Sequence, residues 1–271
     1  MAFIEHNENG LVYMSSTLIP ARHAFTTRWG GVSTGYLSSL NLISGHGDEP
    51  ENIRENFRRV AALLGTGPDD CAVTKQVHGN TVRTVTAADR HPCLSPVPYE
   101  ADGIVTATPG LPIFCFTADC VPVLLCAPDA LVVGAVHCGW RSSVSDILRN
   151  ALDAMSALGT EPGRIRAAIG PAIGSCHFET DSDVPEAIRS WIGPEEAERY
   201  LTLRSDGKYL VDLRGANACR LRQLGLRAEN IDISGECTVC SHDKYWSHRY
   251  TKGRRGGQAA AIVIPPEGDS L

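Results

Sequence analysis

The amino-acid sequence predicts an α+β fold in which mixed β-sheets are flanked by helices. Short apolar runs rich in β-branched residues recur along the chain, and Gly, Pro and Asp bound them; they are too short for helices. Several runs follow one another with no helical segment between them, which argues against a strict alternation of strands and helices. Because 271 residues suffice to bury a core without disulfides or metals, we expect a single domain over residues 1–271.

The first predicted helix begins near Asp48 and Pro50, since Asp commonly caps helices and Pro is tolerated in their first turn. Apolar side chains then recur at helical spacing as far as Leu64. Gly65, a residue type that often follows the last turn, ends the run.

A second helix is expected over 142–158, where one apolar stripe is followed by Gly159, and a third over 214–224. The Pro-rich segment 88–100 is expected to be a surface loop, and the tail after Ile264 is expected to be frayed. The apolar runs that we expect to form strands are 81–86, 103–107, 112–117, 121–126, 131–137, 165–169 and 259–264. No GxGxxG or Walker pattern follows any of them, so a dinucleotide or P-loop site has no support.

Composition narrows the class of protein. With 25 Lys and Arg against 31 Asp and Glu, the formal net charge is -6, which gives no general reason to bind nucleic acid or an anionic membrane. No run approaches the roughly 18 apolar residues of a membrane helix, and the N-terminus lacks the apolar region of a signal peptide. We therefore expect a cytoplasmic protein whose 10 cysteines are mostly free thiols.

Reactive side chains stand where several predicted strands end. His78, Cys120 and His137 together offer two imidazoles and a thiolate, the ligands that Zn²⁺ prefers, and a catalytic zinc uses three protein ligands and one open position. Their wide separation is unlike that of a zinc finger and indicates a site assembled by several strands. Two alternatives remain from the residues alone: structural histidines beside a buried thiol, or a Cys120 nucleophile with a histidine base and an orienting carboxylate such as Asp119.

Other motifs are less specific. Cys237 and Cys240 form a CxxC with His242 and His248 nearby, but no second pair at finger spacing follows, so we favour neither a metal nor a redox role. Arg28, in the segment Thr-Arg-Trp-Gly-Gly, is typical of either an anion site or a hairpin turn.

Two further segments carry less information still. Segment 169–174 is a strand exit that either approaches a ligand or simply turns the chain. Arg254 and Arg255 are expected to lie in a solvated loop.

As a set, the motifs resemble the family long described as multicopper polyphenol oxidase or laccase-type proteins. Its members are now understood as zinc-dependent purine nucleoside phosphorylases with adenosine deaminase activity. The matching blocks run in order through nearly the whole chain: FTTRWGGVSTG (25–35), SLNL (39–42), GDEPENIRENFRR (47–59), KQVHG (75–79), ADG (101–103), ADCVPVLL (118–125), HCGWRS (137–142), IGPAIGSCHFE (169–179), CT (237–238) and SHR (247–249).

The resemblance implies that His78, Cys120 and His137 hold the metal. Zn²⁺ is the expected ion, with Cu²⁺ as an alternative because it binds more tightly at most nitrogen and sulfur sites. A thiolate that ligates a metal would be a poor nucleophile, which weakens the Cys120 alternative. The implied partners are a purine nucleoside and phosphate, without nucleic acid or membrane.

Phosphorolysis requires groups that bind phosphate and orient the nucleoside, and deamination requires a group that moves a proton. The expected binding side chains are Arg28, Arg58, Gln76 and Arg141. Asp119 and Glu179 are the expected proton carriers.

The sequence departs from the family pattern in three places. Cys138 replaces the usual alanine and adds a thiol beside the expected metal site, and Ser142 replaces a glycine. The family's GRQ-like turn reads Gly256-Gly257-Gln258, so an arginine that could contact an anion is missing.

Competing functions are an oxidase, a cysteine hydrolase using Cys120, and a non-catalytic metal-binding or interaction protein. A multicopper oxidase needs many histidine ligands, whereas this chain has 9 histidines and no HxH pair. A complete laccase copper set is therefore not expected.

Overall fold

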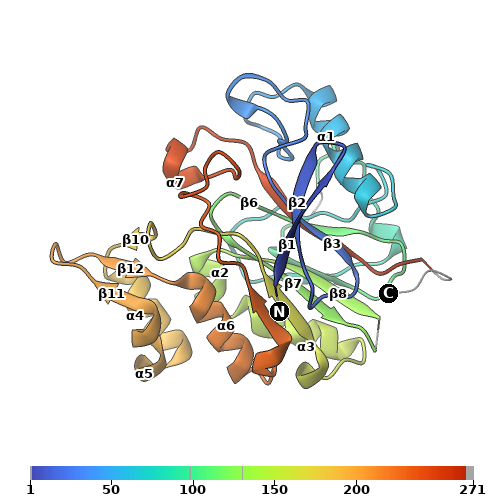
Figure 1. Cartoon of the computed structure of the whole chain (residues 1–271). Coiled ribbons are helices and arrows are strands. Elements are labelled where there is room, and N and C mark those ends of the chain that lie inside the picture. The colour runs from blue at the N-terminus through green and yellow to red at the C-terminus, as the bar shows by residue number, and fades with distance from the viewer. Residues whose placement is uncertain (1, 98, 130, 267–271) are drawn as a thin grey trace.

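A computed structural model describes residues 2–97, 99–129 and 131–266, and it confirms the predicted α+β class. The central layer is a mixed sheet, seen in the middle of Figure 1. Its β4/β5 and β9/β13 pairs are parallel and its other pairs antiparallel. In spatial order the strands are β13 (Ile231–Ile233), β9 (Arg166–Ile169), β7 (Val121–Ala127), β8 (Val132–Cys138), β5 (Gly103–Thr106) and β4 (Val82–Thr84).

A second, antiparallel sheet packs against the central one. Its strands in spatial order are β1 (Phe3–Glu8), β2 (Leu11–Ser16), β3 (Arg22–Thr26), β14 (Gln258–Val263) and β6 (Ile113–Thr117). A small third sheet lies to the left in Figure 1 and consists of β10 (Glu179–Thr180), β12 (Tyr209–Val211) and β11 (Leu201–Leu203).

Helices cover the outer faces of the two large sheets. Beyond the central sheet lie α2 (Trp140–Val144), α3 (Ile147–Ala157), α4 (Asp183–Ile192) and α6 (Leu213–Gln223), while α1 (Pro50–Leu63) covers the second sheet (Figure 1). The short helices α5 (Pro194–Ala197) and α7 (His248–Thr251) lie in connections. Successive side chains of a strand point to opposite faces, so Val132 and Val136 of β8 face the helices, while Val133 and Ala135 face the second sheet.

The first and third predicted helices are confirmed as α1 and α6. The residue before the α1 helix is Glu49, not Asp48, and it makes no side-chain capping bond. The carboxylate of Asp48 instead accepts hydrogen bonds from side chains that include Ser33 (2.6 Å) and Asn41 (2.9 Å). Asp48 therefore ties the preceding loop together.

The continuous helix predicted over 142–158 is wrong, because the chain breaks between α2 and α3. Asp146 adopts a left-handed backbone conformation with φ of 65°. Its carboxylate accepts hydrogen bonds from Arg220 Nε (2.8 Å) and from Trp191 Nε1 (3.1 Å), two side chains from other helices. Tertiary partners thus compensate a local break that the apolar stripe does not reveal.

Every predicted strand segment contains an observed strand, with ends that differ by at most two residues. The sequence did not predict the strands before residue 27, nor β10, β11, β12 and β13. One reason is that such strands can lack an apolar run, as in the mostly exposed and polar β1. The described parts of 88–100 contain no strand, as expected for a loop. Of the predicted tail, residues 267–271 lie outside the described residues. Among the described helices, none has the length and apolar character needed to cross a membrane.

Candidate metal centre and cavity

His78, Cys120 and His137 meet at one edge of the central sheet. Antiparallel pairing brings the end of β8, which carries His137, beside the start of β7, which follows Cys120. His78 comes from the loop before β4. Their ligand atoms all lie within 4.8 Å of one another, with 3.9 Å between Cys120 Sγ and His78 Nε2. The structure therefore brings together the three residues that the sequence singled out.

Asp102, which the sequence reasoning did not assign, orients this cluster. Its side chain is buried immediately before β5, and its Oδ1 atom lies 2.8 Å from Nδ1 of His137. It also accepts backbone hydrogen bonds from Val77, His78 and Gly79 at 2.8–3.1 Å. Because Nδ1 of His137 is engaged, Nε2 is directed to the cluster, as is usual for a metal-binding histidine. A lone carboxylate at the start of a fully buried strand is the signal that could have identified it.

The backbone around the cluster is strained and closely packed. His78 and Asp119 have φ values of 61° and 92°, a backbone region that residues other than glycine rarely adopt. A Cβ atom at Gly139 would lie 3.0 Å from the His78 ring and 3.4 Å from Cys120 Sγ. Such strain of about 1–3 kcal/mol per residue is typical of sites where function fixes the geometry.

The electrostatics of the cluster favour a thiolate. Burial alone would raise the pKa of Cys120, but His137 and His78 outweigh it through charge and hydrogen bonding and lower that pKa to about 6. Burial likewise opposes the charged form of His137, while Cys120 and Asp102 raise its pKa. Two imidazoles and a readily formed thiolate are a donor set that suits Zn²⁺ and other borderline-soft metals.

The cluster lies in the wall of a cavity of about 490 Å³. This size is that of a typical small-molecule site. Apolar side chains of the cavity wall are Ile43, Phe116, Ala118, Trp140, Ile173, Phe178 and Leu213. Polar ones, besides the cluster, are Thr74, Gln76, Thr117, Asp119, His248, Arg249 and Arg255.

The predicted phosphate-binding arginines do not line this cavity. Arg28 donates to the carbonyl oxygens of Ser38 and His242 and stacks over Trp246, so it stabilises a loop. The exposed Arg58 pairs with Glu55 on α1. These two residues are engaged elsewhere and lie apart from the cluster.

Arg141 is likewise outside the cavity. It is exposed, and its guanidinium stacks over the ring of Trp140, 4.3 Å from the centroid. The phosphate role expected of the three arginines thus has no support in the geometry.

Of the other predicted residues, Gln76 and Asp119 line the cavity, whereas Glu179 lies outside it. Gln76 lines the cavity, but its amide bonds the backbone of Phe116 in both directions, at 2.7 and 2.8 Å. Asp119 also lines it, and it accepts 2.6 Å hydrogen bonds from Thr238 Oγ1 and from the backbone N–H of Arg249. These contacts make both residues part of the framework of the wall.

Glu179 does not reach the cavity. It forms ion pairs with Arg204 (2.8 Å) and Lys208 (2.9 Å) at the small sheet. Its expected role as a proton carrier therefore has no support in the geometry.

Arg255 was expected in a solvated loop, which is wrong. It lines the cavity, and its Nε atom is buried with no hydrogen-bond partner in the described structure. Burial lowers its pKa, whereas Cys120 and Asp119 act in the opposite direction. Arg254 follows the expectation, since it is exposed and stacks on Tyr36.

The two substituted positions near His137 are buried in the core. Cys138 has no exposed surface and packs with Ile147 under the helices, on the opposite face of β8 from His137. Because it points away, this thiol is not part of the three-residue cluster. Ser142 is also fully buried, and its hydroxyl has no partner in the described structure.

A cluster of potential metal ligands in the wall of a cavity large enough for a small molecule is typical of an enzyme. Comparison with known proteins identifies the family. A profile of the family described as multi-copper polyphenol oxidoreductase laccase matches residues 22–265. The chain belongs to this family.

Curated relatives cover almost the whole chain. A purine nucleoside phosphorylase of Deinococcus radiodurans is 38% identical over 257 residues, which is 94% of each chain. A purine nucleoside phosphorylase of Corynebacterium glutamicum is 34% identical over 249 residues, 92% of this chain and 96% of that protein.

Solved structures share the fold. The crystal structure of YlmD from Geobacillus stearothermophilus superposes with a TM-score of 0.89 at 31% identity, covering 97% of this chain and all of that one. The Bacillus licheniformis hypothetical protein YfiH superposes with a TM-score of 0.86 at 28% identity, covering 97% and 98% of the two chains.

Proposed function

We propose that this protein is a purine nucleoside phosphorylase that also deaminates adenosine, and that both reactions take place in the cavity beside His78, Cys120 and His137. Relatives that carry the phosphorylase name align over more than nine-tenths of the chain. The observation that carries the proposal is the convergence of the three potential ligands in the wall of a cavity large enough for a nucleoside.

In this proposal the three side chains would hold a zinc ion in the wall of the cavity. Zinc bound there would supply Lewis acidity. Asp102 keeps His137 in the tautomer that presents Nε2, and its backbone hydrogen bonds hold the loop that carries His78. The chain thus fixes the ligand set before substrate arrives.

The nucleoside base is expected to bind against the apolar part of the wall. Phe116, Trp140 and Phe178 offer aromatic surfaces, and Ile173 and Leu213 complete an apolar lining. Aromatic rings stack well on a flat heterocycle, and burial between them excludes water from the reacting bond.

Phosphate is expected to bind Arg255. Its buried Nε–H has no acceptor among the residues that the structure describes, and an anion would satisfy it. In the family pattern an arginine stands where this chain has Gly257, a position at which a Cβ atom would lie 2.8 Å from Ile43. Arg255, two residues earlier, would then supply the missing positive charge from a neighbouring place in the same turn.

Proton transfer is assigned to His248. It lines the cavity, whereas Glu179 does not. Asp119 acts as a positioning residue, because its two carboxylate oxygens hold Thr238 and the backbone of Arg249.

Two alternatives make different predictions. A cysteine hydrolase would use the low pKa of Cys120 for attack, without a metal. A copper-dependent polyphenol oxidase is suggested by the family description. Against the oxidase, the two groups of potential ligands in the described residues contain at most two histidines each, too few for the copper set of a laccase.

The test is an assay of the metal-loaded protein with inosine, guanosine and adenosine, each with and without phosphate. We expect release of the free base only with phosphate, and ammonia from adenosine in either case. Oxygen uptake with a phenol is measured in parallel. Absence of phosphate-dependent base release, with oxygen uptake instead, would overturn the proposal in favour of the oxidase.

A further inference from the structure

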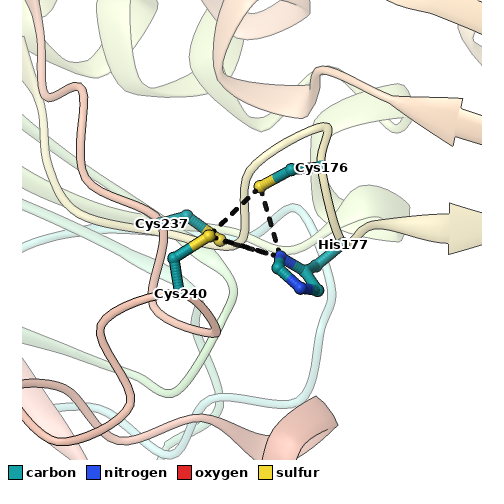
Figure 2. Close-up of side chains that lie close together, drawn as sticks. All are labelled: Cys176, His177, Cys237 and Cys240. Carbon is teal, nitrogen blue, oxygen red and sulfur yellow. Dashed lines mark hydrogen bonds between the residues drawn. The ribbon is translucent and has the colours of Figure 1, made fainter.

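We infer that Cys176, His177, Cys237 and Cys240 form a second zinc site, one in which four protein ligands enclose the ion and the role is structural. This inference is independent of the proposed function, since it concerns another set of residues. The two halves of the cluster are about 60 residues apart in the sequence. Figure 2 shows that the four side chains point toward one another, two from the loop before β10 and two from the segment after β13.

The distances between donor atoms fit a tetrahedral ion. Zinc bonds of about 2.3 Å to sulfur and 2.0–2.1 Å to nitrogen imply S–S separations of about 3.8 Å and S–N separations of about 3.6 Å. Cys176 Sγ and Cys240 Sγ are 3.6 Å apart. From His177 Nδ1 the sulfur atoms of Cys176, Cys240 and Cys237 lie at 3.2, 3.5 and 3.7 Å. Small adjustments would close this set on an ion.

The surroundings also suit a metal thiolate cluster. The backbone N–H of Gly174 donates to Cys237 Sγ at 3.2 Å, an outer contact of the kind that supports metal ligands. A Cβ atom at position 174 would lie 3.2 Å from both Cys176 Sγ and Arg214 Nη2. Glycine therefore lets the loop close, and the nearby guanidinium offsets the net negative charge of three thiolates around a divalent ion.

A disulfide accounts for the arrangement less well. A bond between Cys176 and Cys240 would use two of the four groups and leave Cys237 and His177 without a reason to converge. Zinc uses all four, and four cysteine or histidine ligands are the usual set of a structural zinc site.

The cluster adjoins the wall of the cavity. Phe178, which follows His177 directly, lines the cavity. Thr238, which follows Cys237, donates to Asp119, and Arg249 donates to the carbonyl oxygen of His177 at 3.0 Å. A bound ion would therefore fasten the wall that carries Phe178 and Arg249.

The test is the zinc content of the full-length protein, measured by native mass spectrometry and by elemental analysis. We expect two zinc ions per chain in the wild type. Cys240→Ser and Cys176→Ser should each lose one ion and keep the other, whereas Cys120→Ser should lose the other. Cys93→Ser, a partly exposed cysteine outside both clusters, is the matched control and should keep both.

A second measurement guards against variants that misfold. Cobalt is loaded into the Cys120→Ser protein, and the sulfur-to-cobalt absorption should fall stepwise as cysteines of the four-residue cluster are replaced. One zinc per chain in the wild type, lost on Cys120→Ser replacement, would overturn the inference. A Cys176–Cys240 disulfide in protein purified without reductant and with no second zinc would also overturn it.

Discussion

The two Cys/His clusters use the same kinds of side chain in opposite settings. The first, here called the cavity cluster, consists of His78, Cys120 and His137; a buried carboxylate orients His137, and a cavity of about 490 Å³ adjoins the cluster. The second, here called the outer cluster, consists of Cys176, His177, Cys237 and Cys240; three of its members are exposed, and it joins two loops that are distant in the sequence. Zinc with three protein ligands keeps a position for chemistry, while zinc with four is closed. Ligand number and setting, more than ligand type, therefore separate a reactive centre from a structural one.

The largest expected difference between the two clusters follows from replacement of Cys120. Cys120→Ser replaces the thiolate with a poor zinc ligand of similar volume, so we expect the cavity metal to be lost and both activities to fall roughly 10³-fold or more, because Lewis acidity contributes several kcal/mol. Zinc analysis and both assays measure this. Full zinc with no activity would favour the cysteine nucleophile, and full zinc with full activity would refute the site assignment.

Asp102→Asn tests whether the orienting carboxylate belongs to the cavity cluster alone. Loss of the charge behind His137 should reduce metal affinity at the cavity by about 10- to 100-fold. Competition with a chelator measures the affinity, and the outer cluster serves as the internal control. Equal weakening at both clusters would mean that the variant loosens the whole fold.

Arg255→Gln should raise the KM for phosphate by about 10-fold or more, because a charge-assisted hydrogen bond contributes about 1.5–3 kcal/mol. Metal content should not change at either cluster. Arg254→Gln, at the exposed neighbouring position, is the matched control and should leave the KM unchanged. Identical KM values for the two variants would remove Arg255 from the phosphate site.

The smallest expected effect is a difference in thiol chemistry after the metals are stripped. The pKa of Cys120 is lowered to about 6, so its thiolate persists at neutral pH and decreases only as the pH falls through that value. Burial and the neighbouring Cys240 raise the pKa of Cys176. Between pH 8.5 and 6.5, labelling by iodoacetamide should slow less than about threefold at Cys120 and roughly 100-fold at Cys176. Peptide mass mapping measures both rates, and equal slowing would contradict the electrostatic difference.

The sequence predicted the cavity cluster better than the outer one for a physical reason. His78, Cys120 and His137 each stand near the end or start of an apolar run, and strand ends meet when a sheet forms. The outer cluster joins Cys237 and Cys240 to two loop residues with no such marker. Its assembly depends on long-range packing that local patterns do not encode.

Two other features that the sequence did not predict, the helix break at Asp146 and the burial of Arg255, also depend on long-range packing. The break at Asp146 depends on Arg220 and Trp191, which come from other helices. The burial of Arg255 depends on how its turn packs, since a Cβ atom at Gly256 would lie 2.8 Å from Asn41 and 2.9 Å from Trp246. Without knowledge of this packing, two adjacent arginines in a glycine-rich segment are expected to lie in a solvated loop.

The path of the chain through the cluster of His78, Cys120 and His137 would give a bound ion a mechanical role. Strand β6 belongs to the second sheet and β7 to the central one, so residues 118–120 cross between the two layers. Cys120 lies on this crossing, while His137 belongs to the central sheet. Because the pairing of β7 with β8 places Cys120 beside His137, an ion bound by both would fasten the end of the crossing to the central sheet. Loss of the ion should therefore loosen the point at which the chain passes from one layer to the other.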